Sequence, residues 1–159
     1  MRMEARRLAA AVLFAAVAVA VARPAALELD LGAGAKIDFA PYGVENVTFL
    51  ATAAPWIGSR DRLQAGLILA ASTGATKSDL ELAACLRAWP FKAVAVFGGG
   101  GFIASTGDGP ALVPFTLGGL RLEAGRLGIE TCAEIHLKPD DTDSMLWIAA
   151  LWRLGGPSG

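Results

Sequence analysis

Residues that carry chemistry are scarce in this chain. Its 159 residues include one histidine, one tyrosine and two cysteines, and only 18% of them are charged. A serine–histidine–aspartate arrangement would have to use His136, and two cysteines with one histidine, widely spaced, make a poor zinc site. No cluster of Lys and Arg marks a nucleic-acid interface. The sequence therefore predicts no metal, no cofactor and no nucleic-acid partner.

Motifs for nucleotide binding and nucleophilic catalysis are also missing. The run Gly98–Gly101 lacks the Lys-Ser/Thr of a P-loop and the spacing of a dinucleotide fingerprint, and no G-x-S-x-G element presents a serine. Next to a strand, such a run indicates a bulge, a sharp bend or the close approach of another backbone. No repeat with a period of about 20–50 residues is visible, and no linker divides the chain. We expect a single domain.

The first 22 residues are predicted to form a signal peptide. A basic start with three arginines precedes an apolar run of fifteen residues, Leu8 to Ala22, whose last alanines suit signal peptidase. An uncleaved anchor is the alternative, but a membrane-spanning helix needs about 20 apolar residues. Without residues 1–22, 11 basic and 14 acidic side chains remain, a net charge of −3. We expect export, followed by a single β-rich domain over residues 23–159.

The stretch Leu27–Phe39 alternates between two kinds of residue without a break. Odd-numbered positions carry Leu, Ala, Ile or Phe, whereas even-numbered positions carry Glu, Asp, Lys or Gly. Successive side chains of a strand point to opposite faces, so this period of two predicts a strand with one apolar and one polar face. At about 3.3 Å per residue it would span about 40 Å, much longer than the usual soluble strand. This length is the strongest indication of the fold.

Seven further segments show strand-like alternation between turn residues, which gives eight in all. Two of them, Arg62–Thr73 and Leu80–Trp89, fit a helix equally well. Ser59 would cap the first helix, Ser78 with Glu81 forms a capping box before the second, and Pro90 would end the second. The other segments are Glu45–Ala53, which is followed by a break at Pro55–Arg60, and Phe91–Phe97, Ala111–Glu123, Leu127–Lys138 and Ser144–Leu154.

These segments predict an all-β fold, a small antiparallel barrel or barrel-like sandwich of about eight strands. In an exported chain, strands of about ten residues with alternating faces are typical of outer-membrane barrels, for which eight is the smallest strand number. The single tyrosine argues against the aromatic girdles of such barrels. A soluble sandwich, jelly roll or lipocalin-sized barrel is therefore an equal alternative, and an α+β fold with residues 60–89 helical is the third.

The segment Leu127–Lys138 offers the densest set of polar groups. Glu130, Glu134, His136 and Lys138 share one face at a period of two, so a carboxylate could orient the imidazole as a general base. A polar lumen or solvent face that happens to include a histidine is the commoner arrangement. We take these four as candidate binding residues and assign no catalytic residue.

Cys85 and Cys132 are the two thiols of a chain that is predicted to reach an oxidising compartment, which favours a disulfide between them. In an up-and-down barrel they would fall on the fourth and seventh strands, which are not neighbours. A bridge needs Cα atoms about 4.4–6.8 Å apart. A disulfide would therefore favour a sandwich or a different strand order.

The sequence leads to three functional hypotheses. The first is an exported, non-enzymatic envelope protein, an outer-membrane-type barrel with a structural or adhesive role and the lipid bilayer as its partner. The second is a soluble periplasmic or extracellular β domain that binds a small apolar ligand, a glycan or another protein. The third is a hydrolase that uses His136. We recognise no family in these residues, and nothing in them indicates an oligomeric state.

Overall fold

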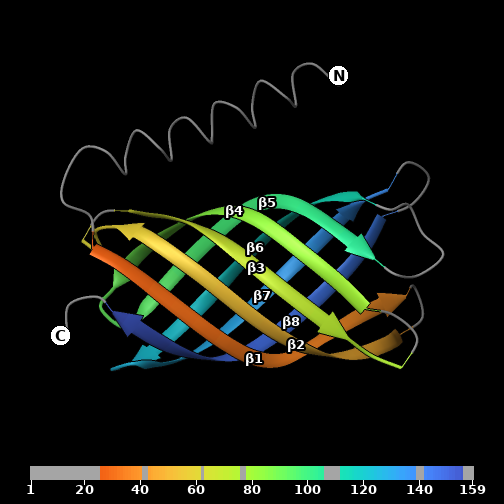
Figure 1. Cartoon of the computed structure of the whole chain (residues 1–159), viewed down its shortest axis with the longest axis horizontal. Coiled ribbons are helices and arrows are strands. Elements are labelled where there is room, and N and C mark those ends of the chain that lie inside the picture. Colours follow the sequence, from red (N-terminus) through yellow and green to blue (C-terminus); the bar gives the residue numbers. More distant parts are fainter. Residues whose placement is uncertain are drawn as a thin grey trace, which may run out of the picture.

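The chain forms a closed barrel of eight antiparallel strands (Figure 1). The computed structural model describes residues 26–40, 43–61, 63–75, 78–105, 112–138 and 142–155. Each strand pairs with the next along the chain, and β8 pairs back with β1 to close the ring. No helix within these ranges is long and apolar enough to cross a membrane. The strands are β1 (Ala26–Ala40), β2 (Gly43–Gly58), β3 (Gln64–Thr73), β4 (Ser78–Phe91), β5 (Val94–Ser105), β6 (Val113–Ala124), β7 (Leu127–Leu137) and β8 (Thr142–Gly155).

The up-and-down order places the connections alternately at two ends of the barrel. β1 begins and β8 finishes at one end, which we call the terminal end, and β1 finishes and β8 begins at the far end. Two to five residues join the strands at the terminal end, and two to seven join them at the far end. The connecting segments are residues 59–63, 92–93 and 125–126 at the terminal end, and 41–42, 74–77, 106–112 and 138–141 at the far end.

The prediction of an all-β barrel is confirmed, and the alternative with residues 60–89 helical is wrong. Most of these residues lie in β3 and β4. Ser78 does not cap a helix, because its hydroxyl lies 3.0 Å from that of Thr73 on the paired strand. Glu81 is buried on the inner face of β4, and Ser59 lies in a turn. Alternation, which buries one face of each strand, has overridden the local helix signals.

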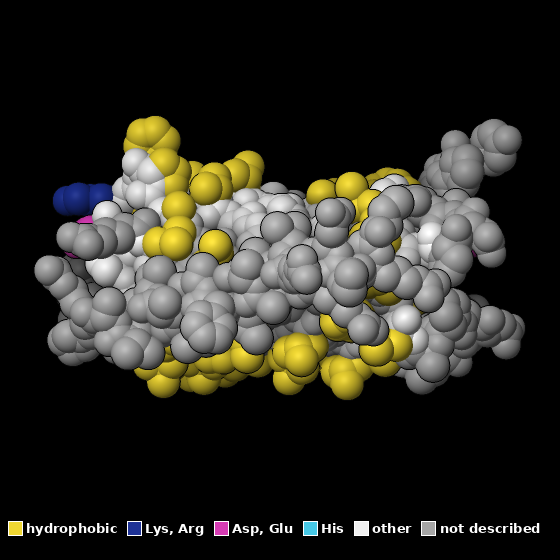
Figure 2. Space-filling model, turned by 90° about the horizontal axis from the view of Figure 1, so that it is seen from above, with side chains coloured by type: hydrophobic (Ala, Val, Ile, Leu, Met, Phe, Trp, Pro, Cys, Tyr) yellow, Lys and Arg dark blue, Asp and Glu magenta, His cyan; other side chains and the backbone are white. Residues whose placement is uncertain are grey.

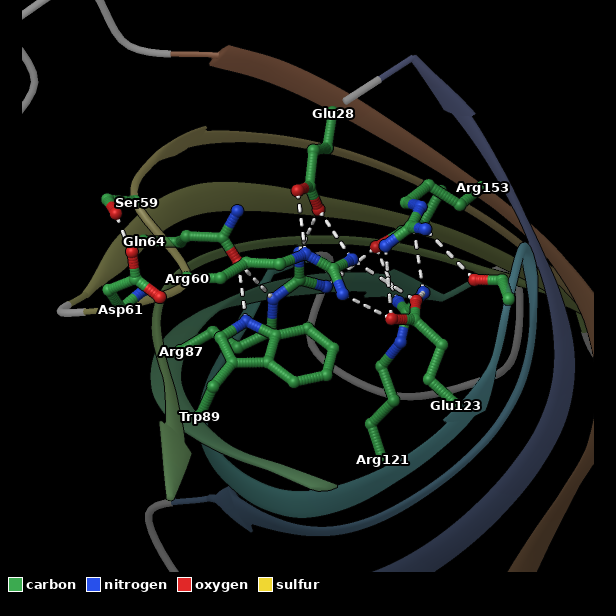
Figure 3. A network of polar contacts seen from close by, with 12 residues as sticks. Glu28, Ser59, Arg60, Asp61, Gln64, Arg87, Trp89, Arg121, Glu123 and Arg153 are labelled. Atoms are coloured by element: carbon green, nitrogen blue, oxygen red, sulfur yellow. Dashed lines mark hydrogen bonds and ion pairs between the residues drawn. The ribbon is translucent and has the colours of Figure 1, made fainter. Parts of the chain in front are cut away.

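Two strands continue through prolines where the sequence indicated breaks. β2 runs past Pro55, and its pairing with β3 is interrupted beside this residue, since proline has no N–H to donate. β4 runs past Pro90, and a bulge between Ala88 and Phe91 accommodates it. Trp89, two residues after the inward-facing Arg87, also points toward the inside of the barrel (Figure 3).

Alternation divides the side chains between the inside of the barrel, called the lumen here, and the outer wall. On β1, Asp30 and Lys36 are fully buried, whereas Leu27 is 62% exposed. Across the described residues, 24 large hydrophobic side chains are exposed, and Figure 2 shows groups of hydrophobic side chains on one side of the outer wall. Exposed charged side chains in the same part of the chain lie at turns or at a strand start: Glu45, Asp61, Lys92 and Arg126.

Inward-facing glycines let neighbouring groups approach closely. A Cβ added at Gly119 would lie 2.4 Å from the Phe97 ring and 2.4 Å from the carbonyl oxygen of Thr131. At Gly99 and Gly101 it would meet backbone atoms of β4 at 2.1 and 1.9 Å. The pairing of β4 with β5 keeps its register through these glycines. Of the three predicted reasons for the glycine run, the close approach of another backbone is therefore the one observed.

Candidate functional site

The lumen is the candidate site, because the buried charges of the described residues gather there. Inward positions of the strands carry them, as the alternation requires. An unpaired buried charge is very costly, so such side chains must contact one another. Most of them do so in two clusters. The buried titratable side chains are Glu28, Asp30, Lys36, Asp38, Asp79, Glu81, Arg87, Arg121, Glu130, Glu134, His136 and Arg153.

The arginine cluster fills the lumen near the terminal end (Figure 3). Arg87 donates from Nη1 to Asp30 at 2.7 Å and from Nη2 to Glu28 at 3.1 Å. Arg121 donates from Nη2 to Asp30 at 3.0 Å and to Glu123 at 2.7 Å. Side chains from five strands and one turn thus meet in one network. We define the cluster as Glu28, Asp30, Arg60, Gln64, Arg87, Trp89, Arg121, Glu123 and Arg153.

Arg60 and Trp89 complete this cluster. Arg60 lies in the turn after β2 and donates to Glu28 at 2.8 and 3.0 Å and also to Glu123. Its guanidinium lies over the Trp89 ring, whose Nε1 donates to Gln64 at 2.7 Å. Burial lowers the pKa of Arg60, but hydrogen bonds and charges of the two glutamates outweigh it and raise that pKa above its ordinary value. Arg60 therefore stays cationic while it covers the terminal end of the lumen.

The lysine cluster surrounds Lys36, further along β1. The Nζ of Lys36 donates to Glu134 on β7 at 2.6 Å and to Glu81 on β4. Trp147 donates from Nε1 to the other oxygen of Glu134 at 2.7 Å, and His136 Nε2 lies 3.3 Å from Glu134 Oε2. Lys36 and the two glutamates are at most 3% exposed. The lysine cluster thus ties four strands together through buried, charge-assisted hydrogen bonds.

Hydrophobic side chains occupy much of the remaining inner face. Phe97 and Trp147 lie with ring centroids 6.5 Å apart, and Phe115 lies 5.6 Å from the His136 ring. Leu50, Ile68 and other buried residues belong to the same hydrophobic cluster. A small barrel with eight strands is about wide enough for its side chains to fill it. The described lumen is accordingly occupied by side chains from both clusters and by this apolar layer.

The four predicted binding residues do not form one site. Glu130 lies 3.8 Å from Arg121, next to the arginine cluster, whereas Glu134 and His136 belong to the lysine cluster. Lys138 follows β7 and pairs with Asp143, with about a third of each side chain exposed. Their common face was predicted correctly for the three that lie in β7. A binding role for them stays a prediction.

The predicted disulfide is wrong. Cys85 on β4 and Cys132 on β7 are both free, and both are buried. Two further strands, β5 and β6, separate their strands in the barrel order. The Cα atoms of cysteines on two strands that are not neighbours lie too far apart for a disulfide in an open, regular barrel. The thiols instead contribute to the hydrophobic cluster of the lumen.

Several residues of the clusters were missed by sequence reasoning. Glu81 and Arg87 alternate with apolar residues along β4, so period two could have placed both of them on the lumen face. Arg60 carries no such signal, because it lies in a turn. Among the described residues, no group of three or more His, Cys, Asp or Glu is arranged to hold a metal ion. What the arrangement does chemically is pair charges and lock the strands together.

Comparison with known proteins gives a likeness of fold. No family model and no curated protein sequence matches the chain. Among solved structures, the chain is similar to the outer membrane protein Ail of Yersinia pestis, with 10% identity, a TM-score of 0.59 and coverage of 80% of this chain and 99% of that one. Neisserial surface protein A is 9% identical, with a TM-score of 0.58 and coverage of 82% and 97%. The N-terminal β-barrel domain of OprF from Pseudomonas aeruginosa is 11% identical, with a TM-score of 0.55 and coverage of 80% and 97%. The chain, a closed barrel of eight strands, thus shares the fold of these small outer-membrane β-barrels.

Proposed function

We propose that this chain is an outer-membrane-type β-barrel that spans a lipid bilayer of the cell envelope and has a structural role there. The observation that carries the proposal is the inverted polarity of the barrel. Arg87, Arg121 and Lys36 have no exposed surface, whereas 24 large hydrophobic side chains of the described residues are exposed, and groups of hydrophobic side chains are visible on the side shown in Figure 2. A soluble protein rarely exposes a continuous apolar surface of this extent, because water disfavours it.

The closed ring supports the same proposal. In hydrocarbon, every backbone N–H and C=O must find a partner within the protein, and a closed barrel achieves this because it has no edge strand. β3, with ten residues, is the shortest strand. At about 3.3 Å per residue and a tilt of about 45°, it rises about 23 Å, close to the apolar band of about 25 Å in membrane barrels.

A structural role is favoured over a conducting or an adhesive one. The two clusters and the apolar layer fill the described lumen, which leaves these side chains in the path that an ion would take. The four connections at the far end contain 17 residues in total. A stable protein–protein interface uses about 20–30 residues on each side, and adhesion would need loops that reach beyond the membrane.

The other two hypotheses have less support. A soluble binding domain would place its apolar faces inside and its charges outside, which is the reverse of the observed arrangement. A hydrolase would need His136 within reach of a nucleophile and of substrate. Within the described residues, the contacts of His136 are with Glu134 and Phe115, and the side chain is 2% exposed. Export through the signal peptide predicted over residues 1–22, which lie outside the described ranges, completes the proposal.

Fractionation with a pair of lysine variants tests the proposal. We expect the protein to need detergent for extraction and to migrate differently on a gel before and after boiling. Ile148 lies in the middle of β8 and Leu127 at the start of β7, and both side chains are about half exposed. A lysine at the bilayer centre costs about 2–4 kcal/mol, but about 0–1 kcal/mol near the interface. Ile148→Lys should therefore reduce insertion into vesicles strongly, and Leu127→Lys only slightly. Recovery of the unmodified protein in a salt wash, or equal behaviour of the two variants, would contradict a membrane barrel.

A further inference from the structure

Part of the outer wall is hollowed near the far end of the barrel. A groove of about 530 Å³ lies across β2, β3, β4 and β5 near the far end of the barrel. This volume falls within the range of about 300–1,000 Å³ that is usual for sites that hold small molecules. The residues that line the groove are Phe49, Ala51, Ala71, Ser72, Thr73, Ser78, Asp79, Leu80, Ala104 and Ser105.

Small residues between large ones produce the hollow. Ala51 on β2 is paired with Ala71 on β3, and Ala71 is paired with Leu80 on β4. Ala104 on β5 is in turn paired with Leu80. Phe49 and Leu80 are more than half exposed and stand up beside these alanines. The result is a trough with methyl groups as its floor and two large apolar side chains as its walls.

The far end of the trough is polar. The Thr73 and Ser78 hydroxyls lie 3.0 Å apart at this rim, where β3 finishes and β4 begins. Further along the same two strands, toward the middle of the wall, Leu69 and Leu82 are paired and about half exposed. The groove therefore passes from hydroxyl groups to hydrocarbon along the direction in which a bilayer passes from headgroups to acyl chains.

We propose that this groove holds one acyl chain of a membrane lipid, with the Thr73 and Ser78 hydroxyls against the ester and headgroup region of the same molecule. The inference rests on the proposed insertion of the barrel into a bilayer, because the groove is continuous with the apolar outer wall. A second copy of the chain fits the groove less well. Its convex wall would meet the hollow over a small area, whereas a stable interface buries about 800 Å² on each partner.

Native mass spectrometry of the folded full-length barrel tests this site. The protein is inserted into vesicles of phosphatidylethanolamine and phosphatidylglycerol, extracted with mild detergent, and weighed with any lipid that it retains. Ala71→Trp would fill the trough, and Ala133→Trp places the same side chain on an exposed outer position of β7, away from the groove. We expect one retained lipid on the unmodified chain and on Ala133→Trp. For Ala71→Trp we expect the fraction with lipid to fall by about ten-fold or more, since the acyl chain loses its apolar contacts.

A second variant, Thr73→Val with Ser78→Ala, keeps the trough and removes the hydroxyl rim. It should retain less lipid than the unmodified chain and more than Ala71→Trp. Equal retention by all four proteins, or a retained second chain in place of lipid, would overturn the site. Heat-dependent migration and flotation with the vesicles are recorded for each variant. Unmodified protein that floats with the vesicles but retains no lipid refutes the groove alone, whereas unmodified protein that does not float refutes the proposed function.

Discussion

The guanidinium carbon of Arg60 lies 4.1 Å from the centre of the Trp89 ring, so a turn residue stacks on an inward-facing residue near the end of β4. Arg60 lies outside the strands, whereas Trp89 continues the inward face of β4 after Arg87. Together they cover the charges of the arginine cluster at the terminal end of the lumen (Figure 3).

Arg60→Ala should lower the free energy of unfolding by about 1–3 kcal/mol, because Glu28 and Glu123 each lose charge-assisted hydrogen bonds. Arg60→Lys should recover part of this loss, since lysine keeps the charge but cannot make the paired contact with Glu28 or stack in the same way. Urea titration of the barrel folded in detergent micelles measures both values. Arg126→Ala, an exposed arginine in another turn at the same end, is the control and should change little. Equal effects of the two alanine variants would contradict the stabilising role of Arg60.

Lys36→Met should destabilise the barrel by about 3–5 kcal/mol, because it leaves the carboxylates of Glu81 and Glu134 buried without their common cation. The double variant Lys36→Met with Glu81→Gln should be more stable than the single one. Glu134 still receives the hydrogen bond of Trp147 in both. A double-mutant cycle of unfolding free energies provides the measurement. Additive losses would show that the ion pair between Lys36 and Glu81 contributes nothing.

Gly119→Ala should destabilise the barrel by about 1–3 kcal/mol, because its methyl group would overlap the Phe97 ring and a backbone oxygen of β7. The adjacent Gly118 faces the outer wall, and a Cβ there would have its nearest contact at 3.8 Å. Gly118→Ala should therefore be neutral, or stabilising by about 0.5 kcal/mol through the unfolded state. Refolding yield and urea midpoint distinguish the two variants. A larger effect at Gly118 would reverse the inward and outward assignment of β6.

Cys85 and Cys132 should resist a water-soluble maleimide in the folded barrel and react only after denaturation, because both thiols are buried in the lumen. Intact mass spectrometry should show no label before denaturation and two labels after it. A mass that is two hydrogens lower in the purified protein, or labelling of the folded barrel, would contradict the observed arrangement of the thiols.

The strand alternation was predictable from the sequence because each strand meets two different environments. Leu27–Phe39 and Leu127–Lys138 keep period two almost from end to end, and their strands match the predicted segments within one or two residues. Between residues 60 and 89, alanine, leucine and glutamate favour helix locally, so composition left two readings open. Pairing with strands on both sides favours strand over helix for these residues. The sequence of a single segment does not show which strands will pair with it.

The contacts inside the lumen were less predictable than the faces. The period-two alternation places Glu134 and Arg87 in the lumen. Which charged side chains contact each other there depends on the register of the strands. Glu134 belongs to the lysine cluster, whereas Glu130, on the same face of the same strand, lies next to the arginine cluster. Arg60 depends on a turn, which period two does not describe. A disulfide was expected from the presence of two thiols, whereas the barrel order keeps them apart.

The pairing of β1 with β8 has a consequence for biosynthesis. Glu28 pairs with Gly155, so the ring joins residues from the two extremes of the sequence. Until β8 has been synthesised, one edge of β1 has unpaired backbone N–H and C=O groups, which can pair with strands of other nascent chains. Aggregation of the polypeptide must therefore be prevented until β8 has been synthesised. A truncated protein that lacks residues 142–155 would have unpaired backbone groups on β1 and β7. We expect it to be recovered in inclusion bodies.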